Sequence, residues 1–263
     1  MPAGEIERAA SAIEQATSGQ HLLLLLDFDG TLADFNPDPQ AVFLPEERRR
    51  LLLTIHDHHH ATVAIVSGRR LSDVRQRAKL PPDNYHAGLH GLEIEGHGER
   101  FEHPRAATAM GIMRELVQAL ARDLNGIPGV SVEDKTLSLV LHFRAAAPAD
   151  VARLPGLLAR HAQRYLDAGE LRIMRGNCMT ELLPNIDWNK GNAVAWIRER
   201  VAAASELPVV CVYIGDDVTD QDAFAALGDN GIAVAASNRA SGAHFYVQGP
   251  PEVEALLRQL ALR

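Results

Sequence analysis

The stretch that decides the fold is His21-Leu-Leu-Leu-Leu-Leu-Asp27-Phe-Asp-Gly-Thr-Leu32. Its first half is a continuous apolar run, and such runs are typical of strands buried on both faces, as in a parallel sheet covered by helices. The run ends in Asp27, and Gly30 allows the backbone to turn sharply just beyond it. We therefore expect a buried parallel strand with carboxylates in the loop at its carboxyl end.

The same design recurs along the chain, with apolar runs at 61–67, 207–215 and 231–235. Helical patterns lie before and between these runs, at 4–20, 46–56, 71–79, 190–204 and 220–227. This alternation predicts an α/β protein with a Rossmann-like, doubly wound parallel sheet. Ligands of such sheets bind beyond the carboxyl ends of the strands, where polar residues follow three of the runs. These residues are Asp27, Ser67 and Asp216.

The middle of the chain follows a different pattern. Helices are expected at 106–124 and 149–168, and strand pairs at 130–144 and 171–183. Within the first pair, large apolar residues alternate with their neighbours, which predicts an antiparallel strand with one packed face and one wetter face. We expect a core domain made of residues 1–104 and 185–263, interrupted by an α+β domain at 105–184.

Composition excludes several classes of function. The chain has 263 residues, with 26 Lys and Arg against 34 Asp and Glu, and a formal net charge of −8. An acidic chain lacks the basic surface that nucleic acids or anionic membranes attract. The apolar run is too short to span a membrane, and the acidic residues Glu5 and Glu7 do not suit a secretory leader. Two cysteines cannot build a disulfide framework, so we expect a soluble cytoplasmic protein.

The loop after the first strand carries two carboxylates, Asp27 and Asp29, separated by one residue. On a turn, both can point beyond the strand end. One can attack a phosphorus atom while the other handles the leaving group's proton, with a divalent cation holding the charges together. Thr31 can donate a hydrogen bond from its hydroxyl group. The simpler alternative is an acidic loop that caps a helix.

Two further segments suit an anion. Ser67-Gly68-Arg69 lies where a strand gives way to a helix, and backbone N–H groups at a helix start lack partners. Taken alone, it would be read as a plain helix cap. Lys190 opens another helix and can neutralise a phosphate as a point charge, although an isolated lysine is more often a solvated surface residue.

In order and spacing, these motifs resemble those of the haloacid dehalogenase-like (HAD) phosphohydrolases. The matching residues are DFDGTL at 27–32, Ser67, Lys190 and GDD at 215–217. Across nearly its whole length the chain is similar to the trehalose-6-phosphate phosphatases. The carrying segments are GLHGLE at 88–93, EDK at 133–135, SLVLHFR at 138–144 and GDDVTDQDAF at 215–224. Gln221 stands where that family usually has Glu.

The resemblance implies a role for each core motif. Asp27 would be the nucleophile that forms an aspartyl-phosphate, and Asp29 would protonate the leaving oxygen and later activate water. Ser67 and Lys190 would hold the phosphate oxygens. The loops around the phosphate would also contribute Gly30, Thr31, Gly68 and Arg69.

The resemblance also implies Mg²⁺, for which clustered carboxylates are suitable ligands. Asp27, the backbone carbonyl of Asp29, and Asp216 would hold the ion. Asp217 and Asp220 would bind metal-bound waters, or Asp220 would instead cap the following helix.

By the same resemblance, the inserted domain is a C2-type α+β cap that determines substrate specificity. Its expected sugar-binding residues are Glu133, Lys135, Arg144 and Glu181. The alternative for all of them is a solvated hairpin surface. In the core, His90 would line the floor of the site or else only support a turn.

The resemblance implies a Mg²⁺-dependent phosphatase that converts trehalose 6-phosphate to trehalose in trehalose biosynthesis. We expect a monomer that binds a small sugar phosphate and no nucleic acid or membrane, and pairing with a trehalose-phosphate synthase stays open. One alternative is another capped phosphatase, acting on sucrose phosphate or mannosyl-3-phosphoglycerate. Another is a non-catalytic sugar-phosphate sensor. A dehydrogenase is disfavoured because no GxGxxG follows any apolar run.

Overall fold

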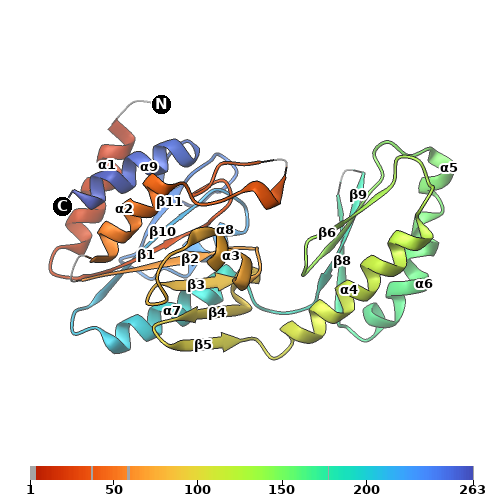
Figure 1. Ribbon diagram of the computed structural model, residues 1–263, viewed down its shortest axis with the longest axis horizontal. Coiled ribbons are helices and arrows are strands. Elements are labelled where there is room, and N and C mark those ends of the chain that lie inside the picture. Colours follow the sequence, from red (N-terminus) through yellow and green to blue (C-terminus); the bar gives the residue numbers. More distant parts are fainter. Residues whose placement is uncertain (1–3, 37, 58–59, 177, 263) are drawn as a thin grey trace. The chain divides into compact units, whose positions relative to one another are not determined.

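The computed structural model describes residues 4–36, 38–57, 60–176 and 178–262. The chain forms two compact units (Figure 1). The core unit comprises the residues up to Glu102 and those from Trp188 onward, and the insert unit comprises His103–Asp187. The chain thus divides after residues 102 and 187, rather than after 104 and 184. The second boundary lies later because Trp188 belongs to the core unit, where its Nε1 donates a hydrogen bond of 2.8 Å to the Gly91 carbonyl oxygen.

The core unit is built on an eight-stranded sheet. Its spatial order is β12 (Phe245–Tyr246), β11 (Ile232–Ala235), β10 (Val209–Gly215), β1 (His21–Leu26), β2 (Ala61–Val66), β3 (Tyr85–Gly88), β4 (Glu93–Gly96) and β5 (Glu99–Glu102). Neighbouring strands are parallel from β12 to β3, and β4 and β5 are antiparallel additions at one edge. The predicted parallel α/β sheet is confirmed, with β1 in its interior.

Helices cover both faces of this sheet. One face carries α1 (Gly4–Thr17), α2 (Glu46–Asp57), α3 (Leu71–Ala78) and α9 (Gly249–Ala261), and the other carries α7 (Lys190–Ala204) and α8 (Asp220–Ala225). Side chains alternate along a strand. Leu24 and Leu26 therefore pack into the first helix layer, while Leu23 and Leu25 pack into the second, and all four are fully buried. This explains why β1 is apolar at every position.

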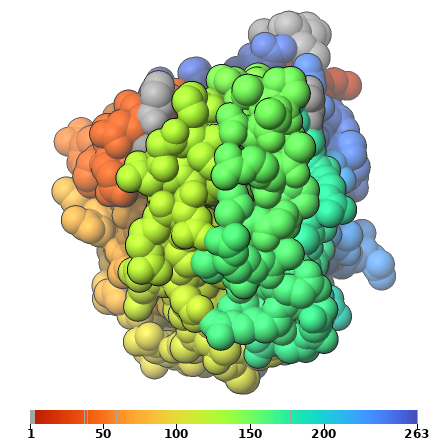
Figure 2. Space-filling model, turned by 90° about the vertical axis from the view of Figure 1, so that its right-hand side faces the viewer, coloured from red at the N-terminus to blue at the C-terminus, as the bar shows by residue number. Residues whose placement is uncertain are grey.

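The insert unit is a separate α+β unit with one layer of helices packed on one sheet. Its antiparallel sheet has the order β6 (Ser131–Asp134), β7 (Leu139–His142), β9 (Met179–Pro184) and β8 (Leu171–Gly176). Two helices, α4 (Ala106–Asp123) and α6 (Leu154–Asp167), cover one face of the sheet, and residues such as Leu139, Leu141 and Leu182 pack beneath them. Figure 2 shows the outer surface of α4 in yellow-green beside α6 in green. Within the described part of this unit, both long helices pack on that one face of the sheet.

The helix predicted at 149–168 is broken in two. A short helix, α5 (Pro148–Val151), ends before α6 begins at Leu154. The cause is Pro155, which has no N–H and whose ring would clash with the carbonyl group four residues earlier. The helix therefore restarts with this proline in its first turn, where a missing N–H costs nothing.

Two 3₁₀ turns complete the described elements, η1 (Pro39–Ala41) and η2 (Leu89–Gly91). The second follows β3 directly, and both Leu89 and His90 have left-handed φ angles, of 53° and 56°. Among the described residues, no helix has the length and apolar content needed to cross a bilayer.

Candidate active site

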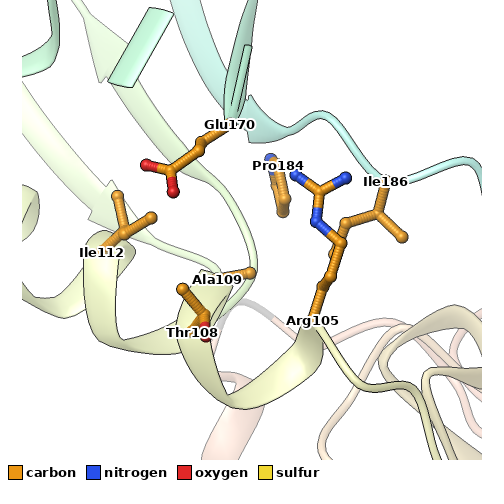
Figure 3. A pocket seen from close by; sticks show the side chains of 7 residues that line it. All are labelled: Arg105, Thr108, Ala109, Ile112, Glu170, Pro184 and Ile186. Carbon is orange, nitrogen blue, oxygen red and sulfur yellow. The ribbon is translucent and has the colours of Figure 1, made fainter. Parts of the chain in front are cut away.

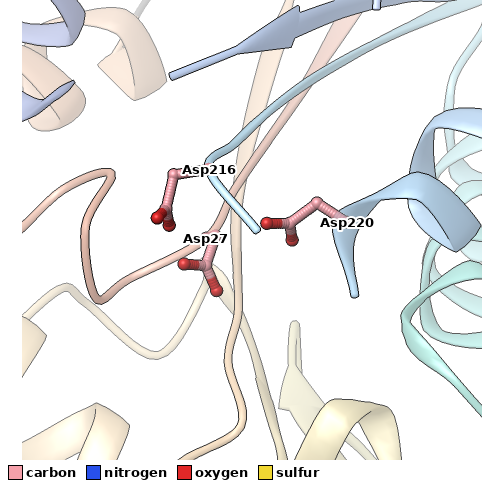
Figure 4. A group of neighbouring side chains, drawn as sticks. All are labelled: Asp27, Asp216 and Asp220. Carbon is pink, nitrogen blue, oxygen red and sulfur yellow. The ribbon is translucent and has the colours of Figure 1, made fainter. Parts of the chain in front are cut away.

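Three carboxylates meet at the carboxyl ends of β1 and β10. These strands are neighbours in parallel register, with Leu26 opposite Ile214, so the residues that follow them emerge side by side. Asp27 follows β1, Asp216 follows β10, and Asp220 begins α8. Figure 4 shows their carboxylates pointing toward one another, and one oxygen of each lies within 4.8 Å of the others.

Lys190 is the cation of this cluster. Its Nζ lies 2.7 Å from Asp27 Oδ1 and 2.6 Å from Asp220 Oδ1, and its side chain is only 3% exposed. Asn189 positions it, because the Asn189 side chain accepts hydrogen bonds from the first turn of α7 and fixes where the helix begins. Burial opposes the charge of Lys190, but the two carboxylates outweigh it and raise its pKa. Lys190 is therefore not a solvated surface residue.

Asp220 is fully buried and both of its oxygens are occupied. Besides Lys190, Oδ1 accepts a hydrogen bond of 2.8 Å from the Tyr213 hydroxyl, and Oδ2 accepts one of 2.9 Å from the Asp217 amide. Thr219 occupies the cap position of α8, so the alternative in which Asp220 caps that helix is wrong. Asp220 instead holds Lys190 against Asp27, and the Asp217 side chain is partly exposed beside it.

The cluster carries excess negative charge. Burial raises the pKa of Asp27 to about 8, and the nearby Asp220 and Asp216 add to this effect while Lys190 opposes it. Burial also raises the pKa of Asp216. Buried carboxylates close together with too few cations are what a divalent ion relieves, and an all-oxygen donor set fits Mg²⁺. The residues present therefore fit the expected cofactor.

Asp216 is approached closely by the loop after β1. Gly30 has a left-handed φ of +85°, and a Cβ placed there would lie 2.6 Å from Asp216 Oδ2. The hydroxyl of Thr31, which is fully buried, donates to Asp216 Oδ1 at 3.4 Å. On the other side, Nη2 of Arg239 donates to Asp216 Oδ2 at 2.8 Å. Glycine is thus required at position 30 for both the turn and the close approach.

Asp29 is held by Arg69. The guanidinium donates two hydrogen bonds of 2.7 Å, from Nε to Asp29 Oδ2 and from Nη2 to Oδ1. Its Nη1 donates to Asp73 Oδ2 at 3.1 Å. Such a two-point contact is a strong, directional one. The structure therefore places Arg69 on the second carboxylate of the motif.

Ser67 and Gly68 lie against the turn that contains His90. Ser67 is 1% exposed, its hydroxyl oxygen accepts a hydrogen bond of 3.2 Å from the Arg69 amide, and its carbonyl accepts one of 2.9 Å from the His90 amide. The His90 ring packs on Gly68, where a Cβ would lie 2.9 Å from the ring. Burial lowers the pKa of His90 to about 4, so the ring is neutral at pH 7. His90 both supports this turn and lies beside the predicted anion loop.

In the insert unit, two predicted carboxylates share the face of the sheet that lies away from α4 and α6. Val140 is opposite Glu133 on one side and opposite Glu181 on the other, and directly paired residues of antiparallel strands point to the same face. Glu181 is buried and accepts a hydrogen bond of 2.5 Å from the Ser138 hydroxyl. Glu133 is exposed and bonds the His142 ring at 2.8 Å.

The two basic residues expected in this unit lie at opposite ends of β7. The amide of Lys135 donates to the Ser138 carbonyl at 2.9 Å, which places it beside the row that contains Glu181. Arg144 lies in an exposed turn two residues beyond the end of β7. It lies two residues past the histidine whose ring bonds Glu133. The structure thus places Lys135 and Arg144 at the two ends of β7, on either side of the carboxylate row.

The insert unit also holds a cavity of about 240 Å³, shown in Figure 3. It is lined by Arg105, Thr108, Ala109, Ile112, Glu170, Pro184 and Ile186. None of these was predicted as a site residue. Arg105 donates a hydrogen bond of 3.0 Å to the Asn185 carbonyl, and Thr108, Ala109 and Ile112 come from the first turns of α4. This cavity is therefore separate from the residues that carry the expected chemistry.

A family model for trehalose-phosphatase matches residues 25–250, which include the carboxylate cluster and the insert unit. The chain belongs to the trehalose-phosphatase family. It is 32% identical over 244 residues to a trehalose-phosphate phosphatase from Mycobacterium bovis, an alignment that covers 90% of this chain and 61% of the relative. The chain thus spans about three fifths of the length of such mycobacterial relatives.

Solved structures share the fold of this family member. The C-terminal domain of trehalose-6-phosphate phosphatase from C. albicans aligns with a TM-score of 0.70 at 21% identity, covering 95% of this chain and 96% of that one. A haloacid dehalogenase-like hydrolase from Bacteroides thetaiotaomicron aligns with a TM-score of 0.58 at 15% identity, covering 91% of this chain and 99% of that one. At these identities the likeness concerns the fold, which is of the HAD type.

Two residues at the site were not predicted from the sequence. Tyr213 lies in β10 and faces α7 and α8, and its hydroxyl in an otherwise apolar run was an available signal. Arg239 lies in the loop after β11, and nothing in its local sequence indicates a partner at Asp216.

Proposed function

We propose that this chain is a Mg²⁺-dependent phosphatase that converts trehalose 6-phosphate to trehalose and phosphate. The proposal is carried by the burial of Lys190, which is paired with both Asp27 and Asp220 at the edge of a three-carboxylate cluster. Phosphoryl transfer needs mainly positioning and neutralisation of charge, and this arrangement provides both. Membership of the trehalose-phosphatase family supports the choice of substrate.

Asp27 is the proposed nucleophile. Lys190 holds Oδ1, so Oδ2 is the oxygen that would attack phosphorus and form an aspartyl-phosphate as the sugar oxygen leaves. Lys190 and the hydroxyl of Ser67 would then hold the phosphate's other oxygens. Attack by water on the phosphorus would release phosphate and restore the Asp27 carboxylate.

Asp29 is the proposed acid and base. It would protonate the departing sugar oxygen and then take a proton from the attacking water. Both of its oxygens accept hydrogen bonds from Arg69 in the structure. Arg69 therefore fixes the orientation of the Asp29 carboxylate, and each of its oxygens keeps a second lone pair that can carry the transferred proton.

The residues that would hold Mg²⁺ are Asp27, Asp216 and the backbone carbonyl of Asp29. When bound, the ion would supply positive charge to the phosphate oxygens as negative charge develops on them. Asp220 accepts three hydrogen bonds from the chain, two of them on Oδ1, so it is proposed to contact the ion through metal-bound water rather than directly.

The sugar contacts are proposed to come from the insert unit. A neutral disaccharide offers hydroxyl groups, which charged side chains bind through hydrogen bonds. Glu133, Lys135 and Glu181 lie near one another on the face of the sheet away from its helices. Arg144, two residues past the histidine whose ring bonds Glu133, belongs to the proposed set as well.

The substrate is tested by measuring phosphate release from trehalose 6-phosphate, sucrose 6-phosphate, mannosyl-3-phosphoglycerate and glucose 6-phosphate. We expect turnover of trehalose 6-phosphate at least tenfold above the others, and its loss after EDTA treatment with recovery on adding Mg²⁺. Preference for another compound would overturn the assignment of the sugar. Binding of trehalose 6-phosphate without any release of phosphate would indicate a sensor.

The nucleophile is tested by Asp27→Asn, which keeps the shape of the side chain but removes the charged attacking oxygen. We expect kcat to fall by about 10³-fold or more, since no other group replaces a covalent nucleophile. The control is Asp57→Asn at the exposed end of α2, where kcat should stay within twofold. Near-normal turnover by Asp27→Asn would show that another group attacks phosphorus.

A further inference from the structure

Arg239 has an unusual position for a surface arginine. Its side chain is 68% exposed, yet its guanidinium reaches a carboxylate that is only 6% exposed, with Nη2 at 2.8 Å from Asp216 Oδ2. Asp216 is one of the proposed Mg²⁺ ligands, and Arg239 has no role in the mechanism described above. An exposed cation thus lies directly on a proposed ligand of the ion, and the contact needs an electrostatic explanation.

The loop that carries Arg239 is tied to Asp216. The amide of Ala236 donates to the Gly215 carbonyl at 2.8 Å, and the Ser237 hydroxyl donates to the backbone carbonyl of Asp216. The Ser237 oxygen in turn accepts a hydrogen bond of 3.1 Å from the Arg239 amide. Ala240, the next residue, is 1% exposed and anchors the loop in the core. The guanidinium is thus delivered to Asp216 by a short and fixed segment.

The charges of the cluster explain the contact. Lys190 serves Asp27 and Asp220, which leaves Asp216 without a cation from the buried interior. Arg239 supplies that cation from the surface. Two positive side chains then face three carboxylates, which formally leaves one negative charge uncompensated in the cluster.

A divalent ion needs the same carboxylate. Asp216 Oδ1 faces the Thr31 hydroxyl and Oδ2 faces Arg239, so an ion that binds Asp216 meets the guanidinium as a like charge at close range. The two cations therefore compete for one ligand. The exposed head of Arg239 can move into solvent at little cost, whereas the buried Lys190 cannot.

We propose that Arg239 is the counterion of Asp216 in the metal-free protein and competes with the divalent cation, so that it sets the affinity of the site. This inference rests on the proposed cation site. It assigns Arg239 a role toward the ion and none in the chemical step. Removal of the charge should tighten cation binding, by about two- to fivefold for an ion pair with one exposed partner.

The experiment is a calorimetric titration of the full chain with Mg²⁺ alone, in the absence of substrate. We expect Arg239→Gln to lower the Kd for Mg²⁺ about two- to fivefold, and Arg239→Lys to stay closer to the wild type because it keeps the charge. The matched control is Arg258→Gln. Arg258 is also exposed, at 54%, and pairs with carboxylates on α9 and α2, so it removes the same net charge far from the cluster. Its Kd should equal that of the wild type.

The titrations distinguish a failure of the role proposed for Arg239 from a failure of the proposed cation site. An unchanged or weaker affinity in Arg239→Gln overturns the inference, and so does an equal gain in Arg258→Gln, which would indicate a general effect of net charge. Asp216→Asn should abolish the heat of binding. If the wild type binds no Mg²⁺, the cation site fails and the inference fails with it, whatever the phosphatase assay shows. The position is largely exposed, so the substitutions should not prevent folding.

Discussion

Gly30 is the residue where the backbone and the carboxylate cluster constrain each other most tightly. Gly30→Ala would place an L-residue at φ +85°, which costs about 1–2 kcal/mol, and would press a methyl group against Asp216. We expect lower stability and Mg²⁺ affinity at least about tenfold weaker, because the collision must move a proposed ligand. Urea unfolding and calorimetric titration measure the two effects separately.

Gly19→Ala is the matched control for that prediction. Gly19 also has a left-handed φ, of +67°, but a Cβ there would meet no heavy atom within 4 Å. It should therefore lose stability through backbone strain alone and keep the wild-type affinity for Mg²⁺. Equal affinities in Gly30→Ala and the wild type would show that Asp216 can move away freely or does not bind the ion.

For single residues, the sequence predicted where the site residues lie better than it predicted which side chains they bond. Asp27 and Asp216 were expected to converge because each ends a buried parallel strand, and the structure places them side by side. The contact of Arg69 with Asp29 was not predicted, because it depends on the direction of a long side chain in the loop before α3. Pairing between distant loops is set by tertiary packing, which a local motif does not contain.

Among the elements, α3 is joined to the segment at 40–42 by hydrogen bonds from a buried arginine. Arg77 is 5% exposed and donates to the carbonyl oxygens of Gln40 and Val42 and to Asp73 Oδ1, at 2.6 to 2.8 Å. Arg77→Met keeps the apolar stem but leaves these acceptors without their donor. We expect a loss of about 3 kcal/mol in the free energy of unfolding, measured with urea.

Arg75 offers a control on the same helix. Its side chain is 45% exposed and makes an ion pair of 2.6 Å with Glu95. Arg75→Met should cost no more than about 1 kcal/mol, as exposed ion pairs contribute little. Similar losses for the two variants would mean that the contacts of Arg77 with the segment at 40–42 do not stabilise the fold.

Elements with a continuous apolar run were predictable, including the four-residue β11, and strands without such a run were not. The apolar runs that became β1, β2 and β10 signal burial on both faces, and each has six or seven residues. By contrast, β3, β4 and β5 contain glycine, histidine or charged residues and no continuous apolar run. The break between α5 and α6 was signalled by Pro155, whose effect on the preceding turn outweighs the helical spacing around it.

At the scale of the whole molecule, the site forms only when residues far apart in the sequence come together. Lys190 and Asp27 are 163 residues apart in the chain, and the entire insert unit lies between them. They meet because β1 lies beside β10 and α7 packs on the same sheet, so the core unit has to be assembled before the charges can pair. The sequence indicated this order of elements, but the buried lysine bridge between two carboxylates follows only from the assembled sheet.

The stability of the core unit should depend on pH through His86. This residue of β3 is 2% exposed, its Nε2 has no hydrogen-bond partner among the residues that the structure describes, and burial lowers its pKa from 6.5 to about 4. Above pH 6.5 the ring is neutral in both the folded and the unfolded chain, and it contributes no pH dependence. Between pH 6.5 and pH 4 only the unfolded chain takes up the proton, so the free energy of unfolding falls as the pH is lowered.

His86→Gln removes this titration and leaves the other groups in place. Between pH 7 and pH 5, the wild type should lose about 2 kcal/mol more than the variant, a difference set by the two pKa values of His86. Urea unfolding followed by tryptophan fluorescence suits the measurement, because both tryptophans, Trp188 and Trp196, belong to the core unit. Parallel pH profiles for the two proteins would show that His86 is protonated within the folded sheet, or that water reaches its ring.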